Sequence, residues 1–409
     1  MFAQRIRRAG AWLPVCLAAA AMAAPPIDPE MALKAPTVHT SPAERYADSQ
    51  RAWQGIPGVE RTRGGRLWAT WYSGGTGEGP LNFVVLVHSD DDGVTWSAPE
   101  LVVDPTDPVR AYDPCLWTDP QGRLWLFWAQ SAGLWDGRGG VWAIVSDNAD
   151  SAKPTWSKPR RISDGVMMNK PTVLANGDWL LPVSGWRFKP PSIEKGLEAM
   201  GYDAPKEAAR AWARSPGDRG GSMVIASADE GRSFSYRGQA LVEHPQHDEH
   251  MVVERKDDSL WMLIRTTYGI GESVSRDGGA TWSTGGPTDI PHPVTRFFVR
   301  RLESGRLLLV RNVPDSEKKG LRTDMTAFVS DDDGRSWKGG LLLDGRDHVS
   351  YPDAVESEDG VLYIIYDRER RDAKEILLAR VREEDILAGK IVAAGSRLQL
   401  LVNKATGQR

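Results

Sequence analysis

Residues 89–96 read Ser-Asp-Asp-Asp-Gly-Val-Thr-Trp, and the pattern Ser-x-Asp-x-Gly-x-Thr/Ser-Trp/Phe recurs from Ser227, Ser275 and Ser330. In such a stretch the aspartate accepts backbone N–H bonds, the glycine adopts a positive φ and the aromatic ring packs against neighbouring strands. These are the properties of a hairpin turn. The four copies therefore predict a repeated β structure in which each repeat carries one such turn.

The spacing of the repeats predicts how many units there are. A degenerate copy over residues 146–156 fills the longest gap, and successive copies then begin 57, 81, 48 and 55 residues apart. Short apolar, β-rich runs lie between them, for example residues 65–71 and 361–366. One four-stranded blade per repeat gives an all-β, six-bladed β-propeller over residues 45–400. Residues 192–214 are helical in composition and predict a short insertion, either a lid over the pocket or a surface loop.

The first residues of the chain predict export. Residues 1–23 combine a basic start, a short apolar run and the small-residue pattern Ala-Met-Ala, which is typical of a secretory signal. We expect a secreted or periplasmic protein without membrane insertion after cleavage, with an N-terminal segment (24–44) and a C-terminal tail (401–409). Cleavage leaves Cys115 as the one cysteine, so no internal disulfide forms. The net charge of −4 argues against a nucleic-acid partner.

A further motif indicates chemistry. Residues 248–254 read Asp-Glu-His-Met-Val-Val-Glu and are followed by Leu-Ile-Arg at 263–265. Together with the repeated turns, known as Asp boxes, this motif resembles the sialidase superfamily over residues 45–399. The resemblance implies that Glu249 activates a tyrosine nucleophile and that Arg265 binds substrate. A base beside the tyrosine is chemically sensible, because a phenol has a pKa near 10.

The same resemblance points to Tyr351, in Ser-Tyr-Pro-Asp at 350–353, as the nucleophile. A neutral phenol suits an anionic sugar, because a carboxylate nucleophile would be repelled by the acid group of the substrate. Arg322 resembles a further carboxylate-binding arginine of the family, and with Arg265 it would form a cationic clamp. Arg296 is expected to be either an extra substrate contact or a surface residue.

The chain departs from the family pattern at Gly55, which stands where sialidases carry the first arginine of the clamp. We expect Gln54, Arg110 or Lys170 to compensate, and an arginine introduced at position 55 to restore the missing cation. Asp367 corresponds to the family's late acidic residue that orients the missing arginine.

The general acid has two candidates. Glu78 lies at the family position, eleven residues before Ser89, and Asp113 matches a pocket-lining aspartate of the next blade. His247 or His250 is expected to bond sugar hydroxyls. No metal or cofactor is expected, because His247 and His250 lack the spacing of a helical ligand pair and no further ligand cluster is evident.

These features predict a secreted exo-glycosidase that hydrolyses a terminal, acidic sugar of a glycan through a retaining tyrosine mechanism. One alternative is a glycan-active enzyme of different specificity, either another glycoside hydrolase or a lyase acting on uronates or deoxy sugars. A non-catalytic glycan-binding propeller is the other alternative, since propellers host unrelated functions.

Overall fold

The computed structural model describes residues 30–105, 108–186, 219–314 and 322–408. The expected signal (1–23) and helical insertion (192–214) lie outside these residues. The described chain is almost entirely β, with one short α-helix, α3 (Glu383–Ala388). No helix among the described residues is long and apolar enough to cross a membrane.

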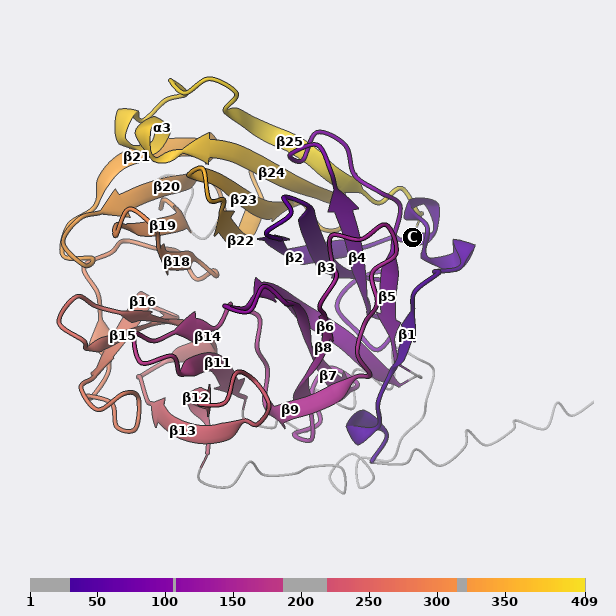
Figure 1. Cartoon of the computed structure of the whole chain (residues 1–409), viewed down its shortest axis with the longest axis horizontal. Coiled ribbons are helices and arrows are strands. Elements are labelled where there is room, and N and C mark those ends of the chain that lie inside the picture. The colour runs from indigo at the N-terminus through magenta and orange to yellow at the C-terminus, as the bar shows by residue number, and fades with distance from the viewer. Residues whose placement is uncertain (1–29, 106–107, 187–218, 315–321, 409) are drawn as a thin grey trace, which may run out of the picture.

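Six sheets are arranged as blades around a central axis (Figure 1). Each blade is built from four consecutive antiparallel strands. Blades 1 to 3 are β2 (Gln54–Arg61), β3 (Leu67–Ser73), β4 (Phe83–Ser89), β5 (Leu101–Asp104); β6 (Val109–Thr118), β7 (Leu124–Ala132), β8 (Gly140–Ser146), β9 (Arg160–Asp164); and β10 (Thr172–Val173), β11 (Trp179–Gly185), β12 (Gly221–Ser227), β13 (Ser235–Ala240). Blades 4 to 6 are β14 (Pro245–Glu254), β15 (Leu260–Thr266), β16 (Gly269–Ser275), β17 (Gly286–Pro287); β18 (Phe298–Arg301), β19 (Leu307–Asn312), β20 (Met325–Ser330), β21 (Lys338–Asp344); and β22 (Val349–Glu356), β23 (Val361–Arg368), β24 (Glu375–Arg382), β25 (Arg397–Lys404). The predicted six-bladed propeller is confirmed.

The ends of the propeller meet between blades 6 and 1. Strand β1 (Thr37–His39) pairs with β5 as a fifth, outer strand of blade 1. Arg51 donates to the Asn403 side chain on β25 at 2.9 Å, and the amide of Thr406 donates to the Asp48 carbonyl at 2.8 Å. The chain after β25 is therefore tied to the segment that leads into β2, which closes the ring.

The Asp boxes join the third and fourth strands of their blades, as hairpin turns should. In the first copy the amide of Gly93 donates to Ser89 Oγ at 2.9 Å, and the amide of Thr95 donates to Asp91 Oδ1 at 2.8 Å. The Trp96 indole N–H donates to the Gly93 carbonyl at 3.2 Å, which fixes the ring over the turn.

Two blades vary this device. In the degenerate copy of blade 2, Asn148 accepts the Thr155 amide at 2.8 Å, so Asn148 rather than Asp147 takes the aspartate's part. In blade 6 the helix α3 stands at the corresponding connection. Its buried Asp385 accepts the amides of Val392 and Ala393 at 2.6 and 2.7 Å. A carboxylate or amide oxygen thus satisfies the turn backbone in both variants.

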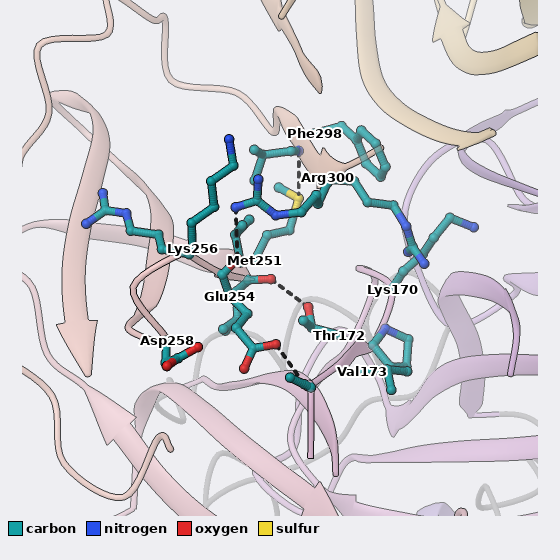
Figure 2. A pocket seen from close by; sticks show the side chains of 16 residues that line it. Lys170, Thr172, Val173, Met251, Glu254, Lys256, Asp258, Phe298 and Arg300 are labelled. Carbon is teal, nitrogen blue, oxygen red and sulfur yellow. Dashed lines mark hydrogen bonds between the residues drawn. The ribbon is translucent and has the colours of Figure 1, made fainter. Parts of the chain in front are cut away.

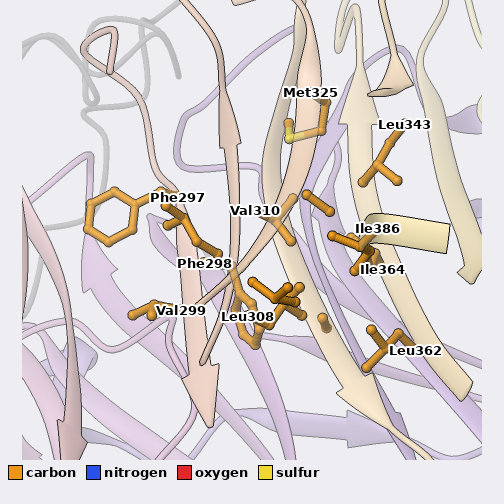
Figure 3. Close-up of a cluster of buried hydrophobic side chains, with 14 of the residues drawn as sticks. Phe297, Phe298, Val299, Leu308, Val310, Met325, Leu343, Leu362, Ile364 and Ile386 are labelled. Atoms are coloured by element: carbon orange, nitrogen blue, oxygen red, sulfur yellow. The ribbon is translucent and has the colours of Figure 1, made fainter. Parts of the chain in front are cut away.

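Apolar side chains fill the space between neighbouring blades. The largest buried cluster joins blades 4 to 6, and Figure 3 shows members of it from blade 5, such as Phe298 and Leu308, and from blade 6, such as Leu362 and Ile364. Blades 2 and 3 are held by aromatic rings, with Trp117 and Trp179 edge to face at 4.7 Å. This packing positions the inner strands.

Charged groups, by contrast, are buried near the axis. The Lys170 ammonium donates to the carbonyls of Val59 and Leu116 at 2.6 and 2.7 Å and to Glu60 at 2.9 Å. Its nitrogen also lies 3.3 Å from Asp353 of blade 6. Burial alone would lower the pKa of Lys170, but the charges of Asp353 and Glu60 raise it. One ammonium therefore links blades 1, 2, 3 and 6.

The remaining blades join the same network. The Asn169 amide donates to the carbonyls of Glu249 and His250 in blade 4, both at 2.9 Å. Arg296, which precedes blade 5, donates to Asn169 Oδ1 at 2.7 Å and lies 3.7 Å from Asp353. All six blades thus meet in one buried polar network.

We expect Lys170→Met to lower the free energy of unfolding by about 3–5 kcal/mol, because it leaves two buried carboxylates without their shared cation. Urea unfolding measures this loss. The control is Lys338→Met, which removes an exposed ion pair to Asp331 and should cost less than about 1 kcal/mol. Equal effects of the two substitutions would show that the axial network contributes no special stability.

Candidate active site

The inner strands of four blades contain irregularities in register that carry the predicted chemistry. Each shift surrounds a residue with positive φ: Ile56 (60°), Asp113 (48°), Glu249 (42°) and Tyr351 (56°). Such a conformation costs an L residue about 1–2 kcal/mol, so the surrounding structure must enforce it. The bulges re-aim side chains out of the ladder, which is a common device beside functional sites.

Three of these side chains form a compact triangle. The Tyr351 hydroxyl donates to Glu249 Oε1 at 3.0 Å, and Arg265 Nη1 donates to the same oxygen at 2.7 Å. Arg265 Nη1 also lies 3.0 Å from the Tyr351 oxygen. All three side chains are buried, with 3–5% of each residue exposed. The sequence prediction that these residues meet agrees with this geometry.

The electrostatics of the triangle set its resting protonation state. Burial raises the pKa of Tyr351, and the nearby Glu249 charge raises it further. Burial alone would also raise the pKa of Glu249, but the charges of Arg265 and His247, together with the hydrogen bonds from Arg265 and Tyr351, lower it. The resting state is therefore a neutral phenol beside a carboxylate that can accept its proton.

Two more guanidinium groups flank the tyrosine. The Arg322 Cζ lies 5.2 Å from the centre of the Tyr351 ring and the Arg370 Cζ lies 4.3 Å from it. Both arginines line a cavity of about 600 Å³ together with Ser350 and Glu78. The predicted Arg322 thus lies beside the Tyr351 ring, together with Arg370, which the sequence analysis did not single out.

Asp367 holds Arg370 in place. Its Oδ2 accepts Arg370 Nε at 2.8 Å and the Ile56 amide at 2.7 Å, while its Oδ1 accepts the Ser350 hydroxyl at 2.7 Å. The expectation that Asp367 orients an arginine agrees with this geometry, although its partner comes from position 370. The sequence contained a clue to this arrangement. The family's acidic residue is present as Asp367 although its arginine is replaced by Gly55, and another arginine, Arg370, follows Asp367 by three residues.

The two candidate acids occupy different environments. Asp113 is buried, and burial followed by the Glu78 charge raises its pKa to about 8. Glu78 is half-exposed and accepts Arg370 Nη1 at 3.3 Å. Glu78 lines the cavity beside Tyr351 and also a second cavity of about 650 Å³.

The second cavity is aromatic. Trp135 and Trp186 meet edge to face at 5.5 Å, and the His247 ring lies 5.1 Å from Trp186. Arg110 also lines this cavity, with its guanidinium 3.7 Å from the Tyr112 ring and bonded to the Leu134 carbonyl. Arg110 therefore lies on the Glu78 side of the site and is not a partner of the Tyr351 cluster.

Other expected substrate contacts lie elsewhere. Lys170 and Arg296 are buried, and their polar atoms bind other groups of the axial network. Neither is therefore available as a substrate contact, and Arg296 is not a surface residue. The buried His250 ring bonds the Met223 carbonyl at 2.8 Å, and burial lowers its pKa to about 4, so it does not serve sugar hydroxyls. Gln54 is buried and donates to the Lys374 carbonyl. Among the described residues no group of three His, Cys, Asp or Glu side chains could hold a metal.

A further cavity, of about 390 Å³, is rich in basic side chains (Figure 2). It lies at the Glu254 end of β14, among residues that include Lys256 and Arg300. It shares no lining residue with the two cavities that Glu78 lines, so it is separate from them.

The fold and the site together define a six-bladed propeller with a buried tyrosine–glutamate pair under a group of arginines. The BNR repeat-like domain family matches residues 65–364, and the chain belongs to this family. No curated protein sequence matches it significantly.

Solved structures with the same fold include sialidase-type propellers. The intramolecular trans-sialidase of Ruminococcus gnavus is 15% identical, with a TM-score of 0.59 over 84% of this chain and 97% of that one. The leech intramolecular trans-sialidase is 14% identical, with a TM-score of 0.60 over 84% and 70% of the two chains. A Dyadobacter fermentans protein of unknown function is 15% identical, with a TM-score of 0.57 over 82% and 96%. The family match and the fold confirm membership of the sialidase-like superfamily, and at these identities the neighbours establish the fold alone.

The raised pKa of Asp113 has a consequence for stability. Between its ordinary value of 3.8 and about 8, the unfolded chain releases this proton while the folded chain retains it. The contribution of Asp113 to stability is therefore greatest at low pH and is lost as the pH rises toward 8. Asp113→Asn keeps the shape and removes the titration, and asparagine tolerates positive φ. We therefore expect the difference in melting temperature, variant minus wild type, to become more positive as the pH is raised from 4 to 8. A difference that does not change with pH would contradict the buried, protonated carboxyl.

Proposed function

We propose that this protein is an exo-glycosidase that hydrolyses a terminal acidic sugar with retention of configuration at the anomeric carbon. The observation that supports this most directly is the 3.0 Å bond from the Tyr351 hydroxyl to Glu249, with Arg265 bound to both. Covalent catalysis needs a nucleophile within hydrogen-bonding reach of a base, and a third group that holds this base in place. The expected signal at residues 1–23 supports an exported enzyme.

In the first half of the reaction, the Tyr351 oxygen attacks the anomeric carbon while its proton passes to Glu249. The bond from the anomeric carbon to the leaving oxygen breaks, and a carboxyl group protonates that oxygen. In the second half, water attacks the anomeric carbon and gives a proton to the carboxylate of the former acid. The bond from that carbon to the Tyr351 oxygen breaks, and the phenol recovers its proton from Glu249. Two displacements at one carbon retain its configuration.

Glu78 is the group that we propose protonates the leaving oxygen. It lies where the two cavities meet, so a sugar beside Tyr351 and a leaving group beside Trp186 would have Glu78 between them. Asp113 is protonated at neutral pH but buried, and reach comes before pKa in choosing a general acid. Asp113 is therefore a buried, neutral neighbour of the site in this proposal.

Replacement of the nucleophile tests the mechanism. Tyr351→Phe should keep the fold but lose about 10³-fold or more of kcat, because only the attacking oxygen is removed. Glu249→Gln should act in the same direction, since an amide does not accept the phenol proton. Tyr366→Phe is the matched control, because Tyr366 is also buried and also bonds a carboxylate, Asp344, away from the site.

The assay follows monosaccharides released from acidic glycans by mass spectrometry. Hydrolysis gives a product one water heavier than the bound residue, whereas an unsaturated product would identify a lyase and overturn the proposal. Full turnover by Tyr351→Phe would also overturn it, and binding of glycans without any product would identify a non-catalytic propeller.

Leaving-group ability distinguishes the two acids. Glu78→Gln should reduce kcat/KM about 10²-fold or more on a glycan substrate, the usual contribution of a general acid, and only slightly on an activated aryl glycoside whose phenolate leaves without help. Asp113→Asn should affect both substrates alike. The reverse pattern would assign the acid to Asp113.

A further inference from the structure

The side chain of Arg370 lies in the space that a side chain at position 55 would need. A Cβ atom added to Gly55 would lie 2.6 Å from Arg370 Cδ and 2.7 Å from its Cγ, closer than real side chains approach. Gly55 is absent from the residues with positive φ, so its backbone does not itself require glycine. Glycine is thus needed at position 55 because the stem of Arg370 fills the space into which a side chain there would project.

Arg370 is fixed in that place. Its Nε bonds Asp367 at 2.8 Å and its Nη2 bonds Ser350 Oγ at 3.3 Å, while its backbone carbonyl accepts the Gln54 amide at 3.2 Å. Burial alone would lower the pKa of Arg370, but Asp367, Tyr351 and Glu78 raise it, so the group stays charged. The Nη1 atom faces the half-exposed Glu78 at 3.3 Å, the longest of its carboxylate contacts and the one most open to exchange.

The charges around Tyr351 are not balanced. Arg265 is paired with Glu249, and Arg370 with Asp367. Arg322 donates to Ser350 Oγ at 3.4 Å and has no carboxylate within ion-pair distance in the described part of the chain. Burial lowers the pKa of Arg322, and the neighbouring Arg370 and Arg265 charges lower it further. Arg322 thus lacks a carboxylate partner among the described residues and lines the same cavity as the charged Arg370, which favours an anion in that cavity.

From this geometry we infer that Arg370 is a specificity-determining residue that binds the carboxylate of the terminal sugar together with Arg265 and Arg322. Arg370 lies in the loop after β23 and supplies the cation that position 55 lacks. Gly55 leaves the space that the Arg370 side chain fills. This inference rests on the proposed function for the substrate class. It also corrects the expectation that an arginine at position 55 restores a missing cation, because that side chain would collide with the one already present.

Binding of small acids tests the inference without turnover. The probes are 2-deoxy-2,3-didehydro-N-acetylneuraminic acid and D-glucuronic acid, each compared with its methyl ester by calorimetry. The wild type should bind at least one acid at least about tenfold more tightly than its ester, which corresponds to one charge-assisted bond. Arg370→Met should weaken acid binding about tenfold or more and ester binding less than about threefold.

Further variants keep the test decisive if Arg370→Met proves unstable. Arg370→Lys keeps the charge and should retain part of the acid preference, and Gly55→Ala should weaken acid binding because its Cβ displaces Arg370. Gly55→Arg alone should also weaken it, whereas the double variant with Gly55→Arg and Arg370→Ala should recover binding from the original position. Arg346→Met is the matched control, because Arg346 pairs with Asp344 and neither residue lines the cavity.

Several outcomes would overturn the inference: no acid binding by the wild type, no preference for acid over ester, or equal losses for acid and ester in Arg370→Met. These results are separate from the proposed mechanism. If Tyr351→Phe retained turnover while Arg370 still governed acid binding, the tyrosine mechanism would fail and the inference would stand. If Tyr351→Phe were inactive and Arg370 had no effect on the acid preference, the inference alone would fail.

Discussion

The polar network around Asp353 and Lys170 is the constraint on which the rest of the propeller depends. Apolar packing holds each blade to its neighbours, but it does not fix how far one inner strand slides past the next. The Lys170 ammonium contacts carbonyls of two blades and carboxylates of two, so its bonds require a single register among them. A buried cation without those partners would cost several kcal/mol, and this penalty excludes alternative registers.

The positions of the candidate active-site residues are a consequence of that register. Glu249 and Tyr351 lie within two residues of groups in the network, since Asn169 binds the Glu249 carbonyl and Asp353 follows Tyr351 by two positions. With the strands fixed immediately beside them, the bulges can hold strained backbone and direct the phenol, the carboxylate and Arg265 toward one point. The stability of the axis thereby supports the strain at the site.

The sequence was sufficient to predict the features of the fold and the site that are local or repeated. The Asp boxes predicted the blades because each box satisfies its own backbone, and the segment around Glu249 predicted its meeting with Arg265 because both lie on paired strands of one blade, where Asp248 is opposite Arg265. Lys170 and Arg296 were misassigned because a buried charge and a substrate-binding charge look alike until their partners are known. Arg370 was missed because its proposed role depends on the room that Gly55 leaves for its side chain. Gly55 lies more than three hundred residues earlier, and the sequence alone does not show that the two residues are neighbours.

In the proposed mechanism, Arg370 also helps to explain how a tyrosine can act as the nucleophile in so enclosed a site. Burial and the Glu249 charge raise the pKa of Tyr351, which protects the neutral phenol at rest, while Arg265, Arg322 and Arg370 lower it. As the proton moves to Glu249, the repulsion between that carboxylate and the developing phenolate disappears, but the attraction of the guanidinium groups remains. The same cations that would hold a substrate carboxylate therefore favour the charge that develops on the nucleophile, so binding and activation depend on one group of side chains.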